Sequence, residues 1–156
     1  MLEVEIPGFG RVRLEHLVSD YNGTLSVDGK LLPGIRDLLN EVAASLKVHV
    51  VTADTYGRAQ SELEGVNCEL HILTGRDEDK QKEAYVRMLG SRGVIALGNG
   101  NNDRQMLRTA RIGIAVCLRE GCSVMALTEA DIAVTSPVDA LELLLHTDRL
   151  KATLRF

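Results

Sequence analysis

Apolar and charged residues alternate over the first fourteen positions of the chain, on both sides of the sequence Pro7-Gly8-Phe9-Gly10. Two period-two segments joined by a short turn that contains glycine are typical of a β-hairpin. The pattern therefore predicts an N-terminal hairpin within residues 1–15.

From residue 16 onward, short apolar runs alternate with segments in which apolar residues recur every three or four positions. The first pattern is typical of buried strands, and the second of helices with one buried face. The predicted strands are 16–20, 48–52, 70–73, 94–97, 112–116 and 131–134. The predicted helices are 35–46, 56–64, 77–89, 102–110 and 138–145, with one more between the last two strands.

This order of elements indicates repeated strand–helix–strand units. Strands that are apolar throughout must be covered by helices on both faces of their sheet. The sequence thus predicts an α/β fold of three layers with a mainly parallel sheet, to which the N-terminal β-hairpin is added. At 156 residues the chain is expected to form a single domain, 1–156, with residues 1–15 as a decoration.

Composition argues against nucleic-acid and membrane partners. The formal net charge is −4, charges of both signs are scattered along the chain, and aromatic residues make up only 3%. There is thus neither a basic stripe nor a stacking platform for nucleic acid. No apolar run approaches the roughly 20 residues that a membrane-spanning helix needs.

The three cysteines, Cys68, Cys117 and Cys122, are odd in number and form no CxxC pair. This argues against a disulfide framework or a structural zinc site. We expect three separate buried thiols in a reducing, cytoplasmic setting.

Polar residues stand where several of the predicted strands end. Asp20 ends the first strand of the predicted sheet, Thr52 ends the second, and Asp103 closely follows the strand 94–97. Ligands of open α/β sheets bind beyond the carboxyl ends of the strands, so we expect these side chains to meet there. The helix 77–89 adds lysines near its start.

Carboxylates, a hydroxyl and an ammonium group at one edge suit phosphoryl transfer. A carboxylate can attack phosphorus covalently, and Mg²⁺ takes one or two carboxylates while it keeps several waters. A hydroxyl, a lysine and the backbone N–H groups of glycine-containing turns can hold the other phosphoryl oxygens.

Three segments carry a family resemblance: LVSDYNGTL, VVTAD and LGNGNND. They resemble the nucleophile motif DxDGT, the threonine-ended second strand and the GDGxND motif of the haloacid dehalogenase (HAD) superfamily. With a lysine before the last motif, they follow the family order over residues 16–145. Within the superfamily, the sequences of these motifs resemble most those of the soluble relatives of P-type ATPases.

The resemblance implies a HAD-like Rossmannoid fold and a Mg²⁺-dependent phosphohydrolase or phosphotransferase that forms an aspartyl-phosphate on Asp20. It also suggests that Asp54, in the motif T-x-D, faces the site. The implied catalytic residues are Asp20, Asn22, Thr52 and Lys82; the phosphate contacts are Gly23, Thr24, Thr52, Ala53 and Lys82; and the Mg²⁺ contacts are Asp20, Asn22 (through its backbone carbonyl), Asn99 and Asp103.

Lys82 is preferred to Lys80 as the motif lysine. In the related pumps, apolar residues follow four and seven positions after the lysine. Val86 and Leu89 have this spacing from Lys82, whereas nothing comparable follows Lys80.

Two positions depart from the family pattern. Asn22 replaces the aspartate that serves as general acid and base, and Asn99 replaces an acidic metal ligand. Loss of proton transfer costs about 10²–10⁴-fold in rate, so we expect slow turnover, and we expect Mg²⁺ to bind only near or above millimolar concentration. The alternative is a catalytically impaired phosphate-binding or regulatory module. A response-regulator receiver is not favoured, because its acidic pair and late lysine are missing.

Members of the family often carry a cap domain after the first motif or between the second and third, but we expect none in this chain. The segments 25–51 and 53–81 are too short to hold one besides the predicted elements. An uncapped site is open, so the expected partner is a small phosphorylated substrate or a phosphoprotein. The N-terminal hairpin offers a strand edge through which the chain could form a homo-oligomer.

Overall fold

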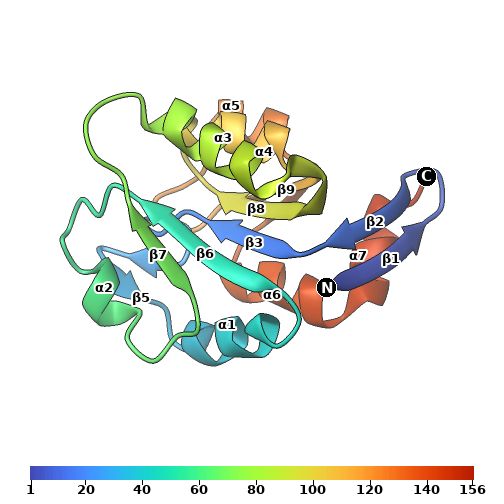
Figure 1. The fold of residues 1–156 in the computed structure, drawn as a ribbon, viewed down its shortest axis with the longest axis horizontal. Coiled ribbons are helices and arrows are strands. Elements are labelled where there is room, and N and C mark those ends of the chain that lie inside the picture. The colour runs from blue at the N-terminus through green and yellow to red at the C-terminus, as the bar shows by residue number, and fades with distance from the viewer.

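The computed structural model describes residues 1–156 and centres on one six-stranded sheet (Figure 1). All its strand pairs are parallel, and their order is β10-β9-β8-β3-β6-β7. The bounds are β3 (His16–Ser19), β6 (Lys47–Thr52), β7 (Glu69–Ile72), β8 (Val94–Gly98), β9 (Ile112–Val116) and β10 (Ile132–Val134). Every predicted strand is confirmed, with ends that differ by a residue or two.

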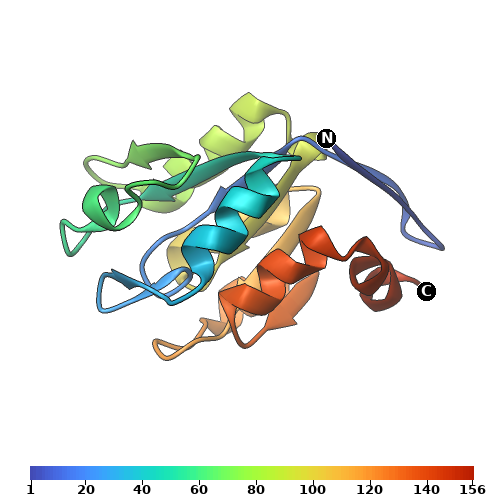
Figure 2. The same cartoon turned by 90° about the horizontal axis from the view of Figure 1, so that it is seen from below.

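Helices cover both faces of the sheet, which confirms the three-layer α/β prediction (Figures 1 and 2). One face carries α3 (Glu78–Leu89), α4 (Arg104–Thr109) and α5 (Val124–Glu129), and the other carries α1 (Ile35–Ala43) and α6 (Pro137–Leu145). Successive strand residues enter opposite cores, because strand side chains alternate between faces. Leu17 belongs to the core beside α1 and α6, whereas Val18 belongs to the core beside α3 and α4.

The chain crosses over beside β3. It first builds β6 and β7 on one side of β3 and then β8, β9 and β10 on the other side. The carboxyl ends of β3 and its neighbours therefore flank the place where open α/β sheets bind ligands.

The predicted N-terminal hairpin is confirmed as β1 (Leu2–Ile6) and β2 (Gly10–Leu14), which pair antiparallel. It extends away from the sheet, and α7 (Thr147–Leu154) packs beneath it (Figure 2). Helix α7 was not predicted. Only its Leu150 and Leu154 are buried, and together they close the apolar side of the hairpin.

The connections hold only small additions. A second hairpin, β4 (Ser26–Val27) and β5 (Lys30–Leu31), follows β3, and α2 (Ala59–Glu62) is shorter than the predicted helix 56–64. Short 3-10 turns, η1 (Ser91–Gly93) and η2 (Asn101–Asp103), precede β8 and α4. Between β3 and β6, and between β6 and α3, the chain forms only β4, β5, α1, α2 and β7. None of the helices has the length and apolarity that crossing a bilayer requires.

The cysteine prediction is wrong for two of the three residues. Cys117 and Cys122 form a disulfide, and Cys68 alone is free, half-buried rather than buried. The physical reason is the tight turn after β9, where Leu118 and Gly121 form a bridge and bring the two cysteine Cα atoms to 4.7 Å. This turn carries Glu120 toward the carboxyl edge of the sheet.

Candidate active site

Asp20 lies at the carboxyl end of β3 and is only 6% exposed. Its backbone N–H donates to the carbonyl of Leu97 in β8 (2.9 Å), which fixes it between two strands. Lys82 Nζ donates to its Oδ1 (2.8 Å), and Thr24 Oγ1 donates to its Oδ2 (3.1 Å). Residues from three separate segments thus meet at one carboxylate.

Lys82 reaches this point from the buried face of α3, which it shares with Val86. Its Nζ bridges Asp20 and the Oδ1 of Asp103 (2.7 Å). Burial alone would lower the pKa of Lys82, but the two carboxylates outweigh burial and hold that pKa above its ordinary value. Lys80 is exposed and pairs with Asp77 at 3.5 Å, so the structure places Lys82, and not Lys80, in the site.

Asp103 is fully buried, and both of its carboxylate oxygens accept hydrogen bonds within the site. Its Oδ1 accepts from Lys82, and its Oδ2 accepts from the backbone N–H groups of Asn99 (3.0 Å) and Gly100 (2.9 Å). The carboxylate therefore positions both the lysine and the loop after β8. A side chain at Gly98 would prevent this, because its Cβ would lie 2.5 Å from the Asp103 Cβ.

The charge balance around Asp20 is unusual for a carboxylate. Burial, together with the nearby Asp103, raises the pKa of Asp20 to about 6, although Lys82 acts in the opposite direction. A group that stabilises negative charge on Asp20, such as a cation, therefore has a large effect on its protonation.

Thr52 ends β6, is 1% exposed, and lines the same cavity as Asp20 together with Ala53. Its Oγ1 accepts from the backbone N–H of Asp54 (3.0 Å). Asp54 itself does not line the cavity. Its Oδ1 accepts from the N–H groups of Arg58 and Ala59 at the start of α2, which corrects the expectation that it faces the site.

Asn22 and Asn99 line the same cavity as Thr52, and Gly23 is next to both of these asparagines. The Oδ1 of Asn22 is buried and has no hydrogen-bond partner. The Oδ1 of Asn99 accepts from Thr24 (3.2 Å), and its Nδ2 donates to the carbonyl of Gly121 (3.2 Å). Gly23 has a φ of 78°, and a Cβ there would lie 2.6 Å from both Asn99 Nδ2 and Glu120 Oε2.

These side chains surround a cavity of about 210 Å³. Its lining comprises Asp20, Asn22, Thr52, Ala53, Thr55, Glu78, Lys82, Asn99, Gly100, Asn102 and Glu120. Of the predicted site residues, Gly23, Thr24 and Asp103 lie behind this lining.

The sequence prediction missed Thr55, Glu78, Asn102 and Glu120. Glu78 could have been predicted, because it precedes Lys82 by one helical turn and so lies on the same helix face. The acidic residues next to it instead favoured the interpretation of a solvated helix start. Glu120 had no sequence signal, because only the turn after β9 brings it to the site.

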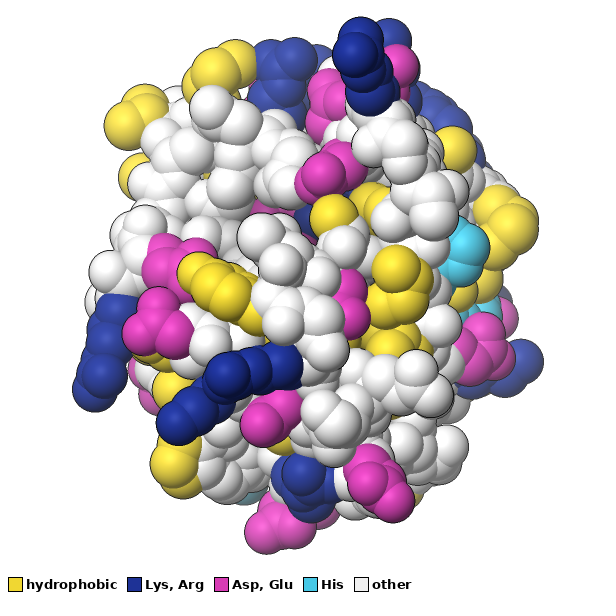
Figure 3. Space-filling model, turned by 90° about the vertical axis from the view of Figure 1, so that its left-hand side faces the viewer, with side chains coloured by type: hydrophobic (Ala, Val, Ile, Leu, Met, Phe, Trp, Pro, Cys, Tyr) yellow, Lys and Arg dark blue, Asp and Glu magenta, His cyan; other side chains and the backbone are white.

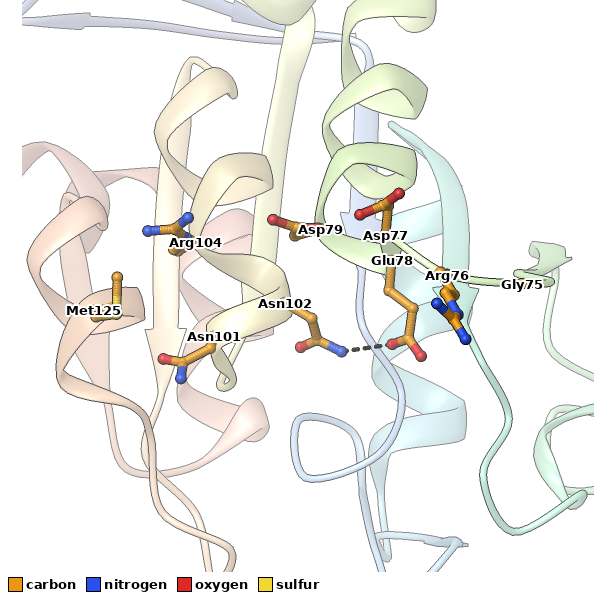
Figure 4. Close-up of a pocket in the computed structure, with 9 residues that line it drawn as sticks. All are labelled: Gly75, Arg76, Asp77, Glu78, Asp79, Asn101, Asn102, Arg104 and Met125. Carbon is orange, nitrogen blue, oxygen red and sulfur yellow. Dashed lines mark hydrogen bonds between the residues drawn. The ribbon is translucent and has the colours of Figure 1, made fainter.

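A larger hollow of about 670 Å³ adjoins the first and shares Glu78 and Asn102 with it (Figure 4). The Nδ2 of Asn102 donates to Glu78 Oε2 (2.8 Å) at the boundary. Arg76 and Arg104 also line the larger hollow, and Met125 is its one hydrophobic residue. Acidic and basic side chains are interspersed over this side of the molecule, without a continuous patch of either sign (Figure 3).

The donor set fits a hard divalent cation held by few charges. No group of three or more His, Cys, Asp or Glu side chains is placed to hold a metal ion. The carboxylate of Asp20, the unpartnered Oδ1 of Asn22 and the amide oxygen of Asn99 do lie around one cavity. Mg²⁺ needs only one or two carboxylates when waters complete its shell.

No family model matches the chain. An uncharacterized protein of Methanocaldococcus jannaschii, MJ0073, is 48% identical to it over 62 residues, which are 40% of this chain and 67% of that protein.

Several solved structures share the fold. The cobalt-bound deoxy-D-mannose-octulosonate 8-phosphate phosphatase of Haemophilus influenzae has a TM-score of 0.71 and 9% identity, over 92% of this chain and 94% of that one. The 3-deoxy-D-manno-octulosonate 8-phosphate phosphatase of Moraxella catarrhalis, in complex with magnesium and phosphate ions and KDO, has a TM-score of 0.64 and 19% identity, over 91% and 94%. A HAD superfamily hydrolase (subfamily III A) of Legionella pneumophila has a TM-score of 0.67 and 15% identity, over 90% and 87%.

The chain therefore has the fold of the haloacid dehalogenase superfamily, and it belongs to one family with the protein MJ0073 of M. jannaschii.

Proposed function

We propose that this protein is a Mg²⁺-dependent phosphohydrolase or phosphotransferase that forms an aspartyl-phosphate on Asp20. The observation that carries the proposal is the buried contact of Asp20 with Lys82 at 2.8 Å, beside a polar cavity at the carboxyl edge of the sheet. The names of the structural neighbours, which are phosphatases crystallised with cobalt or magnesium, support the same reaction and a divalent metal.

In the proposed first step, a carboxylate oxygen of Asp20 attacks the phosphorus of a phosphate monoester. The new O–P bond forms as the bond to the leaving oxygen breaks, and that oxygen takes a proton from water. In the second step, water attacks the phosphorus, and its proton passes to the hydroxide that the first step left. The bond from phosphorus to Asp20 breaks, which releases Asp20 as a carboxylate together with inorganic phosphate.

Lys82 offsets the negative charge that spreads over the phosphoryl oxygens, and Thr52 and the backbone of Ala53 hold the same group. Asp20, Asn22 and Asn99 would hold Mg²⁺, which supplies charge neutralisation when bound. Asp103 has both oxygens engaged with Lys82 and backbone N–H groups, so we assign it to positioning rather than to metal contact.

Asn22 sets the speed of this reaction. An amide cannot give a proton to the leaving group or take one from water, and that role is worth about 10²–10⁴-fold. We therefore infer that good leaving groups react, and that the aspartyl-phosphate persists. P-type ATPases, whose motifs these segments resemble, also form a persistent aspartyl-phosphate. The phosphoryl donor can then be either a small phosphorylated compound or a phosphoprotein.

The leaving group would lie in the larger hollow shown in Figure 4. Its lining of two arginines, three acids and two asparagines favours a polar leaving group over an apolar one.

The test uses acetyl phosphate and an aryl phosphate with Mg²⁺. Wild type should acquire an acid-stable, hydroxylamine-sensitive phosphoryl group, Asp20→Asn should not, and Asn22→Asp should hydrolyse the aryl phosphate about 10²-fold faster. If the wild type is not labelled and Asn22→Asp gains nothing, the proposal is wrong.

A second candidate function is a phosphate-binding regulatory module without turnover. Asn22 and Asn99, which replace a general acid and a metal ligand, favour it. This candidate predicts saturable binding of phosphate without any label on Asp20.

A further inference from the structure

Four arginine side chains line one hollow at the amino edge of the sheet, away from the candidate active site. Arg11 and Arg13 come from β2, Arg92 from η1 before β8, and Arg111 from the residue before β9. They form the whole lining of a space of about 530 Å³. The hairpin lies at the end of the sheet opposite to the carboxyl ends of the strands (Figure 1), and Arg92 and Arg111 precede β8 and β9 at that same end.

The positive charge of this arginine pocket is only partly balanced. Glu3 pairs with both hairpin arginines, at 3.3 Å to the Nε of Arg13. Neither Arg92 nor Arg111 forms an ion pair. Glu5 stands opposite Arg11 in the hairpin register but makes no ion pair either. With both Glu3 and Glu5 counted against the four arginines, the pocket still has an excess of two positive charges.

The N-terminal hairpin fixes the positions of three of the four arginines: its turn contacts Arg111, and its strand β2 carries Arg11 and Arg13. The guanidinium of Arg111 stacks 4.3 Å from the centre of the Phe9 ring and donates to the Phe9 carbonyl (3.2 Å). The hairpin arginines alternate with the buried Val12 and Leu14, so the pleat of β2 sends both to the same side. Side chains positioned in advance lose less entropy when a ligand binds.

Four guanidinium groups around one space repel one another, and an anion between them removes that repulsion. Guanidinium groups bind phosphate oxygens in pairs of parallel hydrogen bonds. The pocket volume lies in the usual range for small-molecule sites, about 300–1,000 Å³, which leaves room for more than one phosphate group.

We propose that the arginine pocket binds a small molecule with two or more linked phosphate groups. Pyrophosphate, tripolyphosphate and the phosphate chain of a nucleotide share this chemistry. The pocket has no residue in common with the candidate active site, so the inference does not depend on the proposed function.

The experiment titrates tripolyphosphate, pyrophosphate and orthophosphate into the full chain by isothermal calorimetry, without Mg²⁺. Four proteins are compared: wild type, Asp20→Asn, the pair Arg92→Gln/Arg111→Gln, and the charge-matched pair Arg108→Gln/Arg149→Gln. The last two arginines are surface residues, 61% and 57% exposed, outside the arginine pocket. Amide NMR shifts of Phe9 and Gly10 report on the site directly.

Tripolyphosphate should bind wild type, Asp20→Asn and the control pair with equal affinity, and bind Arg92→Gln/Arg111→Gln at least about tenfold more weakly. Orthophosphate should bind more weakly than tripolyphosphate. Equal weakening in both arginine pairs, loss of binding in Asp20→Asn, or unshifted Phe9 and Gly10 amides would overturn the proposal. So would single-stranded RNA that binds the pocket more tightly than tripolyphosphate at equal salt.

Discussion

Lys82 separates two buried carboxylates that would otherwise repel each other. Its Nζ lies 2.8 Å from Asp20 and 2.7 Å from Asp103, and all three side chains are largely or fully buried. Removal of one member of a buried ion cluster costs about 3–5 kcal/mol, because it leaves charge without compensation. The lysine is therefore both a candidate catalytic group and a structural requirement.

Lys82→Met should destabilise the protein most at alkaline pH. Without the ammonium group, one of the two carboxylates is stable only when it is protonated, so its pKa rises above its value in the unfolded chain. Stability should then be lost as the pH rises from 5 to 8, which urea unfolding at several pH values measures. Lys82→Met/Asp103→Asn has one carboxylate fewer and should show less of this loss. If both variants have the same pH profile, the carboxylates do not repel each other.

Gly23 is constrained both by its backbone and by its neighbours. Gly23→Ala should lose stability through the left-handed φ of 78°, about 1–2 kcal/mol, and through contact with Asn99 and Glu120. Gly34→Ala is the matched control, since its φ is 82° but no atom lies within 4 Å of the added Cβ. In urea unfolding, Gly23→Ala should cost more than the control, and only Gly23→Ala should reduce labelling of Asp20. If the two substitutions lower the free energy of unfolding equally, the side chains of Asn99 and Glu120 can move away from the added Cβ.

Hydrogen bonds between His16, His49 and Tyr85, called the histidine chain below, join three elements of the fold. The Nε2 of His49 in β6 lies 3.0 Å from Nδ1 of His16 in β3, and its Nδ1 lies 2.9 Å from the hydroxyl of Tyr85 in α3. Burial lowers the pKa of both histidines, and for His49 this outweighs the carboxylate of Glu69 at 3.4 Å. The folded chain therefore holds these rings in the neutral form.

The expected consequence is a loss of stability in weak acid. A histidine in the unfolded chain has a pKa near 6.5, so below that pH the unfolded chain gains protons that the folded chain does not. The contribution of the neutral histidines is complete above about pH 7 and falls as the pH drops through 6.5 toward their lowered pKa. Asp20, with its raised pKa, acts in the opposite sense, so variants must be compared with wild type at each pH.

His49→Gln should flatten this acid dependence in urea unfolding between pH 7.5 and 5.5. His146→Gln, an exposed position outside the histidine chain, should leave it unchanged. An unchanged slope in His49→Gln would show that the acid loss comes from other groups.

Elements could be predicted from the sequence where burial leaves a periodic pattern. The four inner strands, β9, β8, β3 and β6, are buried on both faces or nearly so, and their apolar runs are plain in the sequence. The edge strands β7 and β10 are partly exposed, and their apolar runs are shorter. Helix α7 was missed because it buries only Leu150 and Leu154, too few to establish a helical period. The disulfide was missed because a spacing of five residues has no fixed meaning until the turn after β9 is known.

The same reasoning explains which site residues could be predicted. Asp20, Thr52 and Asn99 stand at or just beyond the ends of parallel strands, which all open on one edge, so their meeting follows from topology. Lys82 followed from the spacing of Val86 on the same helix face. Asp103 was predicted in the site too, but its hydrogen bonds to Lys82 and to backbone N–H groups were not. Glu120 was missed because its position depends on the path of a loop, which a periodic pattern does not record.

For the whole molecule, a cation bound at Asp20 would add to the charge compensation that Lys82 already gives this buried carboxylate. A cation that binds only the folded chain stabilises it by RT ln(1 + [L]/Kd), about 1.4 kcal/mol at ten times Kd. For a chain of this size that corresponds to a rise of about 3–5 °C in the unfolding midpoint. With Asn99 in place of an acid, we expect this rise to require Mg²⁺ well above millimolar concentration.

Asn99→Asp should move the half-maximal Mg²⁺ concentration downward by about tenfold, since a second carboxylate then faces the ion. Asp20→Asn removes the one carboxylate of the proposed Mg²⁺ contacts and should abolish the rise. Thermal unfolding followed by circular dichroism over a Mg²⁺ series measures all three proteins, and a matched Na⁺ series of equal ionic strength separates binding from screening. If Mg²⁺ stabilises Asp20→Asn as much as wild type, the ion binds elsewhere on the acidic surface, and the proposed metal contacts are wrong.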